Sequence, residues 1–279
     1  MEWYMKRRTI VFICIVFFVG LAVLLYPTVS NYINSLNQGN AIAEYNQSVG
    51  QLSKQDYRTI LEKANRYNAE LLKKANRFKL SPKEQEEYNS VLNLSGDGII
   101  GYIEIEKLGI KLSIAHGMSE SVLEKGIGHM EGSSVPCGGP GTHAVLVGHR
   151  ALPSAKLFTD LDQMEEGDIF TLHTLNLVLT YQVDQIKIVK PDHMGDLSIE
   201  EGKDYVTLVT CTPYAVNTHR LLVRGKRIAT VKKDNALEIK KEIHNNKSFS
   251  LFETAPIVIA SVLLIIFSIV VIKFIKMRK

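Results

Sequence analysis

The chain is apolar at both ends and changes its hydrophobic spacing twice in between. Residues 10–26 and 255–272 contain no charged side chain. Each stretch, at about 18 residues, is long enough to cross the hydrocarbon core of a bilayer. We therefore predict two transmembrane helices, within an N-terminal anchor at 1–30 and within a C-terminal anchor and basic tail at 255–279.

Helix-like spacing follows the first apolar stretch. Apolar side chains recur mostly three or four residues apart, at Ile42, Tyr45, Val49, Leu52, Ile60, Ala64, Tyr67, Leu71 and Ala75. This period predicts helices with one apolar stripe, so residues 31–96 are expected to form a helical N-terminal region. The stripe favours packing on a core or on another helix, and a solvated spacer is the alternative.

From Gly98 onward the pattern changes to short apolar runs separated by glycine and proline. Such runs predict roughly eight strands and a mainly β domain, a barrel or a sandwich, at residues 97–232. Short helical turns are expected at 119–125 and 156–162, and a charged linker at 233–254. The expected strand runs are IIGYIEI, GIKLSIAHG, THAVLVGH, DIFTLHTLNLVLTYQVDQIKIV, YVTLVTC and RLLVRGKRIATV.

Basic residues flank the two apolar ends and predict their orientation. Lys6, Arg7 and Arg8 precede the first stretch, and four basic residues follow the second, at Lys273, Lys276, Arg278 and Lys279. Both termini should therefore be cytoplasmic and the middle of the chain extracellular. A cleaved signal peptide is the alternative for the first stretch, but no clear A-x-A site follows it. The net charge of +4 is partly explained by these clusters and does not call for a nucleic-acid partner.

Cys211 is the strongest candidate nucleophile. It ends the alternating run 205–210, and Pro213 two residues later prevents further strand pairing, so the thiol should lie at a sheet rim. Arg220, nine residues on, is a permanent cation that would favour the reactive thiolate. With three cysteines, one of them inside the first apolar stretch, only Cys137 and Cys211 could form an extracellular disulfide. That disulfide would abolish thiol chemistry, and we expect Cys211 to be free.

His149 is the best acid/base partner among eight histidines. It follows a glycine at the end of the run 142–148, and so also lies at a strand end. His143 should lie too far along the same strand, and His219 should point to the other face. The remaining histidines are expected on the surface or in loops: His116, His129, His173, His193 and His244. No pair of ligands shows zinc spacing, and the glycine-rich turn 138–141 lacks a phosphate-binding continuation, so neither metal nor cofactor is expected.

The segments TLVTCTPYAVNTHRLLVRGKR, GTHAVLVGHR and SAKLFTDLD resemble the sortases, membrane-anchored cysteine transpeptidases of Gram-positive bacteria. With a second anchor at the C-terminus, the chain is most similar to the class C branch, which polymerises pilins. The resemblance implies an eight-stranded sortase β-barrel, with Cys211 as nucleophile, His149 as acid/base and Arg220 holding the substrate and the oxyanion.

The implied reaction cleaves an LPxTG-like sorting signal between Thr and Gly and passes the acyl group from Cys211 to a lysine of the next pilin subunit. Two alternatives stay open: a housekeeping-type sortase that attaches surface proteins to peptidoglycan, and a non-enzymatic two-anchor scaffold.

Many class C enzymes carry an Asp-Pro-aromatic lid upstream of the barrel. Residues 71–97 here lack this triplet and have Ser81-Pro82 instead. We therefore expect an open or weakly inhibited site, in which deletion of residues 71–95 hardly alters thiol labelling of Cys211. Phe78 and Tyr88 are the aromatic residues that could still cover the cleft.

Overall fold

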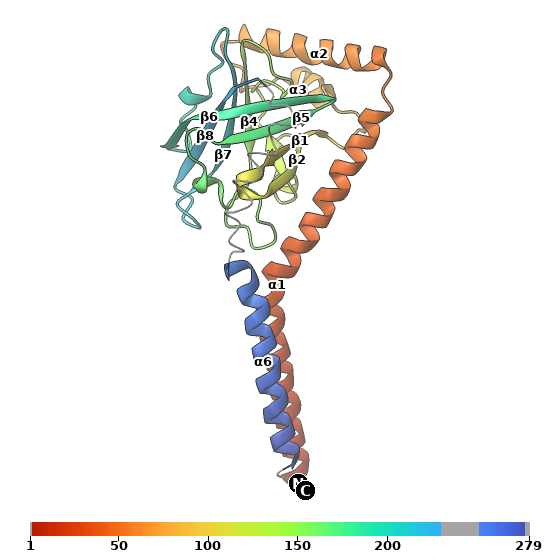
Figure 1. Cartoon of the computed structure of the whole chain (residues 1–279), viewed down its shortest axis with the longest axis vertical. Helices are drawn as coiled ribbons and strands as arrows, with labels where there is room; N and C mark the ends of the chain where they lie inside the picture. The colour runs from red at the N-terminus through yellow and green to blue at the C-terminus, as the bar shows by residue number, and fades with distance from the viewer. Residues whose placement is uncertain (1, 230–250, 277–279) are drawn as a thin grey trace.

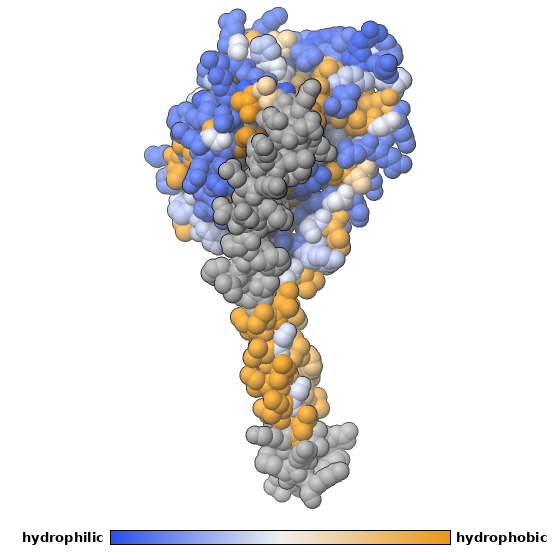
Figure 2. Space-filling model, viewed as in Figure 1, coloured by the Kyte–Doolittle hydropathy of each residue, from blue (hydrophilic) through white to orange (hydrophobic). Residues whose placement is uncertain are grey.

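The computed structural model describes residues 2–229 and 251–276, and places a β-barrel on a stalk of two helices (Figure 1). Helices α1 (Glu2–Gly50) and α6 (Leu251–Lys276) run side by side in the stalk, where the rings of Phe17 and Phe267 stack with centroids 4.0 Å apart. On the face shown in Figure 2, the coloured part of the stalk is mostly hydrophobic. Within the described residues, α1 is long and apolar enough to span a membrane, whereas the apolar stretch of α6, Pro256–Val270, is shorter.

Helix α1 continues without a break from the apolar stretch to the barrel. It passes through Pro27 and through residue 30, where the sequence had suggested a boundary. Its upper part packs Ile42 and Tyr45 against Tyr102 of the barrel. The apolar stripe predicted from Ile42 onward therefore faces a core.

Polar side chains of α1 also form hydrogen bonds with backbone groups of the barrel and of its loops. Asn31 Oδ1 accepts from the backbone N–H of Lys156 at 2.9 Å, and Tyr45 Oη donates to Ile100 O at 3.2 Å. Asn34 Nδ2 and Gln38 Nε2 both donate to the carbonyl of Lys125. Since these partners are backbone groups, α1 is held in one register along the barrel.

Two capped helices follow α1. In α2 (Lys54–Leu72), Ser53 and Asp56 form a capping box, and Ala64, Tyr67 and Leu71 are buried, as their spacing predicted. In α3 (Pro82–Ser90), Ser81 forms the same motif with Glu84, and Pro82 begins the helix where its missing N–H costs nothing.

The eight strands close into a barrel in the order β1-β2-β3-β4-β7-β8-β6-β5. Their bounds are β1 (Ile99–Ile105), β2 (Ile110–His116), β3 (Ile127–His129), β4 (Thr142–Val147), β5 (Ile169–Thr174), β6 (Leu177–Val189), β7 (Asp204–Thr212) and β8 (His219–Arg227). Most neighbours are antiparallel, but β2 pairs with β3 and β4 pairs with β7 in parallel. The short helices η1 (Glu106–Leu108), α4 (Glu120–Leu123), η2 (Leu161–Gln163) and η3 (Gly195–Leu197) lie between strands. The predicted eight-stranded, mainly β barrel is confirmed.

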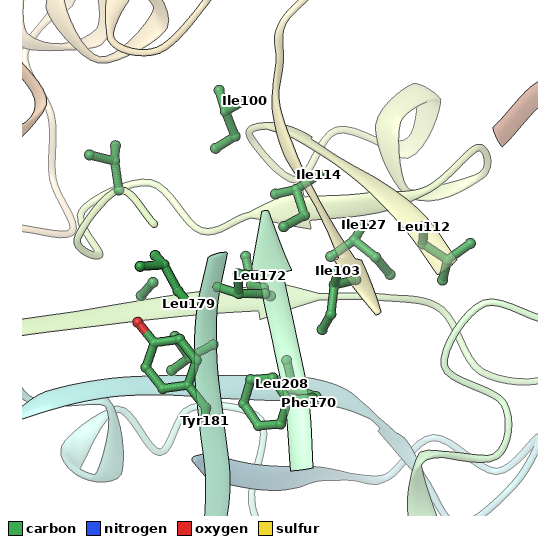
Figure 3. Close-up of a cluster of buried hydrophobic side chains, with 14 of the residues drawn as sticks. Ile100, Ile103, Leu112, Ile114, Ile127, Phe170, Leu172, Leu179, Tyr181 and Leu208 are labelled. Atoms are coloured by element: carbon green, nitrogen blue, oxygen red, sulfur yellow. The ribbon is translucent and has the colours of Figure 1, made fainter. Parts of the chain in front are cut away.

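Aliphatic and aromatic side chains from most strands fill the barrel (Figure 3). The fully buried members include Ile103, Ile114, Ile127, Leu172 and Leu208. The predicted alternation accounts for this core, because every second residue of a strand points inward.

Some expectations about the barrel were wrong. Strand β3 has only three residues, too few for an alternating pattern to be recognised. His129 on that strand was expected at the surface but is fully buried, and this burial lowers its pKa to about 3. Tyr88 Oη bonds to both Nδ1 and the carbonyl of His129, at 2.9 Å each, so Tyr88 fastens α3 to the barrel. The short helical turn expected at 156–162 is present, because hydrogen-bonded turns in this segment lead into η2. Most of the expected linker at 233–254, with His244, lies outside the described residues.

Candidate active site

The candidate site lies on the outer face of β4, β7 and β8. Val145, Val209 and Leu222, one from each strand, form a buried cluster there with Leu197 of η3. We call this set the outer-face cluster. The residues next to them on each strand, such as Leu146, Leu208 and Val223, point into the barrel core instead.

Cys211 and Arg220 face each other at the end of this surface. They are directly paired residues of the antiparallel strands β7 and β8, one step beyond the pair Val209 and Leu222 on the same face. Paired residues point to the same side of a sheet with Cα atoms about 5 Å apart. Both side chains are half-buried, and Cys211 is a free thiol.

His149 follows the end of β4, the strand on the other flank of β7. Strands β4 and β7 pair in parallel up to Val147 and Val209, and the bonds continue past the end of β4. Gly148 N donates to Val209 O at 3.1 Å, and Thr210 Oγ1 donates to Gly148 O at 2.7 Å. Continuing this register by two residues places His149 opposite Cys211. The structure therefore pairs Cys211 with Arg220 and puts His149 two residues past the end of the neighbouring strand β4; we call these three positions the row.

A glycine is required immediately before His149. A Cβ at position 148 would lie 2.7 Å from Ile127 Cδ1 and 2.7 Å from the ring of Phe158. Glycine, which has no Cβ, lets the backbone pass close to these core side chains, so that the His149 imidazole lies at the rim of the sheet.

Arg220 keeps its charge available to a ligand. Its Nη1 donates to Asn217 O at 3.2 Å and to His219 O at 3.1 Å, which are backbone carbonyls. Among the described residues, no carboxylate forms an ion pair with it. A guanidinium held by carbonyls and not neutralised by an acid can bind a developing oxyanion.

The loop between β7 and β8 leaves apolar side chains exposed next to the thiol. Tyr214 and Val216 are 57% and 64% exposed. The guanidinium of Arg150 lies 5.8 Å from the ring centroid of Tyr214, and it also pairs with Asp162 and donates to Thr212 Oγ1. Arg150, in the loop after β4, therefore contacts both the end of β7 and the loop that follows β7.

An aromatic residue packs against the outer-face cluster, although not within the Asp-Pro-aromatic sequence typical of the class. Phe78, half-buried, lies in the segment 73–81 between α2 and α3 and packs on the cluster. Arg77 holds this segment by donating to Leu197 O at 2.6 Å, and its guanidinium lies 4.5 Å from the Phe78 ring centroid. Phe78, one of the two aromatic residues that the sequence offered as a cover, therefore packs on the sheet face that carries Cys211.

We predict that Phe78→Ala raises the rate at which iodoacetamide alkylates Cys211 severalfold, because the ring no longer restricts the face leading to the thiol. Peptide mass spectrometry of the full chain reports this rate for Cys211 alone. Leu80→Ala is the matched control, since Leu80 lies in the same segment but packs on the main barrel core. Equal rates in wild type and Phe78→Ala would show that Phe78 does not restrict access.

The other thiol and histidine candidates are structural. Cys137 is buried beside Asn68 Nδ2 at 3.2 Å, and burial raises its pKa to about 12. His143 is buried on β4 and bonds to Ser198 O and Thr207 Oγ1, away from the row. Among the described residues, no group of three His, Cys, Asp or Glu side chains is arranged to hold a metal ion.

One charged neighbour of the row was not predicted. Glu120 Oε1 of α4 lies 3.3 Å from His149 Nε2. Nothing in the sequence connects two residues 29 positions apart on different elements.

Comparison with known proteins agrees with this architecture. The sortase domain family matches residues 103–228. Sortase D of Bacillus subtilis is 30% identical over 131 residues, which cover 46% of this chain and 63% of that relative's length. The crystal structure of sortase C1 from Streptococcus agalactiae is 50% identical with a TM-score of 0.67, covering 69% of this chain and all of that one. Sortase C of Clostridium perfringens, solved with the C-terminal cell wall sorting motif, is 40% identical with a TM-score of 0.61, covering 68% and 99%.

The closed barrel and these matches define an enzyme of the cysteine transpeptidase class. The chain belongs to the sortase family, and its solved relatives place it in the class C, pilin-polymerising branch.

Proposed function

We propose that this protein cleaves an LPxTG-like sorting signal between Thr and Gly and transfers the acyl group to a lysine amine of a pilin subunit. The observation that carries the proposal is the direct pairing of Cys211 with Arg220, with His149 just past the end of the neighbouring strand β4. It combines a nucleophile, a proton-transfer group and a fixed cation, which are the parts that acyl transfer through a thioester needs.

In the first half-reaction, the Cys211 thiolate attacks the carbonyl carbon of the substrate Thr. Negative charge moves to the carbonyl oxygen, and the Arg220 guanidinium stabilises it. The tetrahedral intermediate collapses, the C–N bond breaks, and the departing glycine amine takes a proton from His149. A thioester on Cys211 remains.

In the second half-reaction, an uncharged lysine amine attacks the thioester. His149 accepts the proton lost by this amine, and the C–S bond breaks to restore the thiolate. The product is an isopeptide bond, and atoms and protons balance over the two steps.

The exposed loop residues Tyr214 and Val216 offer an apolar surface for a peptide next to the thiol. The partner class is supported by a relative solved with a sorting motif and by the structure of Streptococcus pneumoniae sortase C, 42% identical, which gives insights into pilin substrate specificity. For this chain we propose a two-pass membrane protein with α1 and α6 as anchors, an extracellular barrel and both termini in the cytoplasm, in line with the basic residues at both ends.

The test is to trap the thioester on the full-length chain in detergent micelles. Incubation with a synthetic peptide containing Leu-Pro-x-Thr-Gly should add the mass of its N-terminal fragment to the peptide that contains Cys211. Hydroxylamine should remove this adduct, and a lysine-containing pilin peptide should convert it to an isopeptide product. An enzyme that forms no adduct with a panel of such sorting peptides would refute the proposed function.

A further inference from the structure

The contact between Glu120 and His149 joins the candidate acid/base to a separate element. His149 Nε2 and Glu120 Oε1 are 3.3 Å apart, and the two side chains are 27% and 71% exposed. A carboxylate only accepts hydrogen bonds, so this contact requires the ring proton on Nε2 when the imidazole is neutral. The other nitrogen, Nδ1, is then left unprotonated and free to take a proton.

We infer that Glu120 is the positioning residue for His149, fixing its tautomer and ring orientation for proton transfer at Nδ1. The inference rests on the proposed function, in which His149 exchanges a proton with the substrate amines. In general, the hydrogen bond made by one nitrogen of a histidine decides which nitrogen is available for chemistry.

The carboxylate is carried by an anchored element. Helix α4 begins at Glu120, and Leu123 on the same turn packs over Gly128 of β3, where an added Cβ would lie only 2.9 Å from Leu123 Cδ2. At the other end of the turn, the carbonyl of Lys125 accepts from both Asn34 and Gln38 of α1. Gln38 Oε1 in turn accepts from Ser113 N at 2.6 Å, so α1, β2 and α4 are bound together.

The other charges around His149 do not offer an alternative partner. Arg150 follows it in sequence, but its guanidinium is engaged by Asp162 and Thr212. Arg220, across the row, is a cation and cannot accept a hydrogen bond. Among the described residues, Glu120 is the carboxylate that pairs with His149.

An exposed ion pair of this kind contributes little to folding, so its removal should leave the protein intact. Its effect is expected on the chemistry. A change in chemistry without a change in stability distinguishes a positioning role from a structural one. Glu120→Ala can therefore be tested in the folded, full-length chain.

The first test reads the tautomer directly. ¹⁵N NMR of histidine-labelled full-length protein in micelles, with His149→Gln to assign the signal, should show His149 mainly as the Nε2–H form at alkaline pH. Glu120→Ala should give a mixture of both tautomers, and Glu120→Gln, which keeps an acceptor oxygen, should restore the wild-type form. Glu124→Ala removes an exposed carboxylate from the residue after the same helix and should leave the signal unchanged. An unchanged tautomer in Glu120→Ala would overturn the inference.

The second test measures turnover of an LPxTG peptide with a lysine-containing acceptor. Glu120→Ala should lower kcat about tenfold, the effect of losing roughly 1.4 kcal/mol, with KM for both peptides unchanged. Glu120→Gln should recover most of this loss. A rise in the acceptor KM at constant kcat would instead assign Glu120 to amine recruitment and overturn the positioning role. If wild type forms no thioester, the proposed function fails; if wild type is active and Glu120→Ala matches it, only this inference fails.

Discussion

Replacing Cys211 with alanine is expected to abolish the thioacyl adduct and to lower kcat for transpeptidation by at least about 10⁴-fold. The reason is that the other two thiols cannot take the acyl group, because Cys137 is buried and Cys14 lies in the apolar part of α1. The measurement is the formation of the isopeptide product from a sorting peptide and a lysine-containing acceptor, followed by mass spectrometry.

The matched control is Cys137→Ala. Its sulfur is buried, and its raised pKa of about 12 keeps it a thiol at neutral pH. This variant loses the contact with Asn68 and some stability, but it should form the adduct at a rate close to that of wild type. Cleavage of the sorting peptide by Cys211→Ala would contradict the mechanism.

Replacing Arg220 with lysine should lower kcat/KM by about 10²-fold or more, the usual cost of losing an oxyanion donor. Lysine keeps the positive charge but not the planar, multiply donating guanidinium, part of which is already engaged by the carbonyls of Asn217 and His219. Single-turnover kinetics of adduct formation isolate the step at which the oxyanion forms.

Arg66→Lys, an exposed exchange on α2, controls for the general effect of the substitution and should leave the rate unchanged. A rate within about twofold of wild type for Arg220→Lys would show that a point charge suffices, and would remove the donor geometry from the mechanism.

The strands and the candidate residues could be predicted because their signals are local. Alternation marks each long strand, and Pro213 marks the end of β7, which the structure places at Thr212. Each of Cys211, His149 and Arg220 could also be recognised from its own surroundings. The place of His149 relative to Cys211 could not, because it depends on the parallel register between β4 and β7, strands that are more than 50 residues apart.

The features missed from the sequence depend on contacts between distant elements. His129 is polar but buried, since Tyr88 and Ser134 satisfy both of its ring nitrogens. Phe78 was named from the sequence as a possible cover, but its packing on the outer-face cluster could not be predicted, because it depends on a segment held by Arg77. Glu120 belongs to a four-residue helix whose place is fixed by α1 and β3. No periodicity within a segment reports such contacts.

Under the proposed membrane topology, helix α1 also sets how the enzyme meets its partners. The part of the helix beyond Pro27 spans 23 residues, or about 35 Å at 1.5 Å per residue, and it is bonded to the barrel along its length. With its apolar part in a membrane, the barrel is carried at a set height and cannot turn away from its anchor. The barrel then meets any partner bound to the same membrane by lateral diffusion in two dimensions. The length of the helix sets the height at which they meet, and with it the effective concentration of the partner.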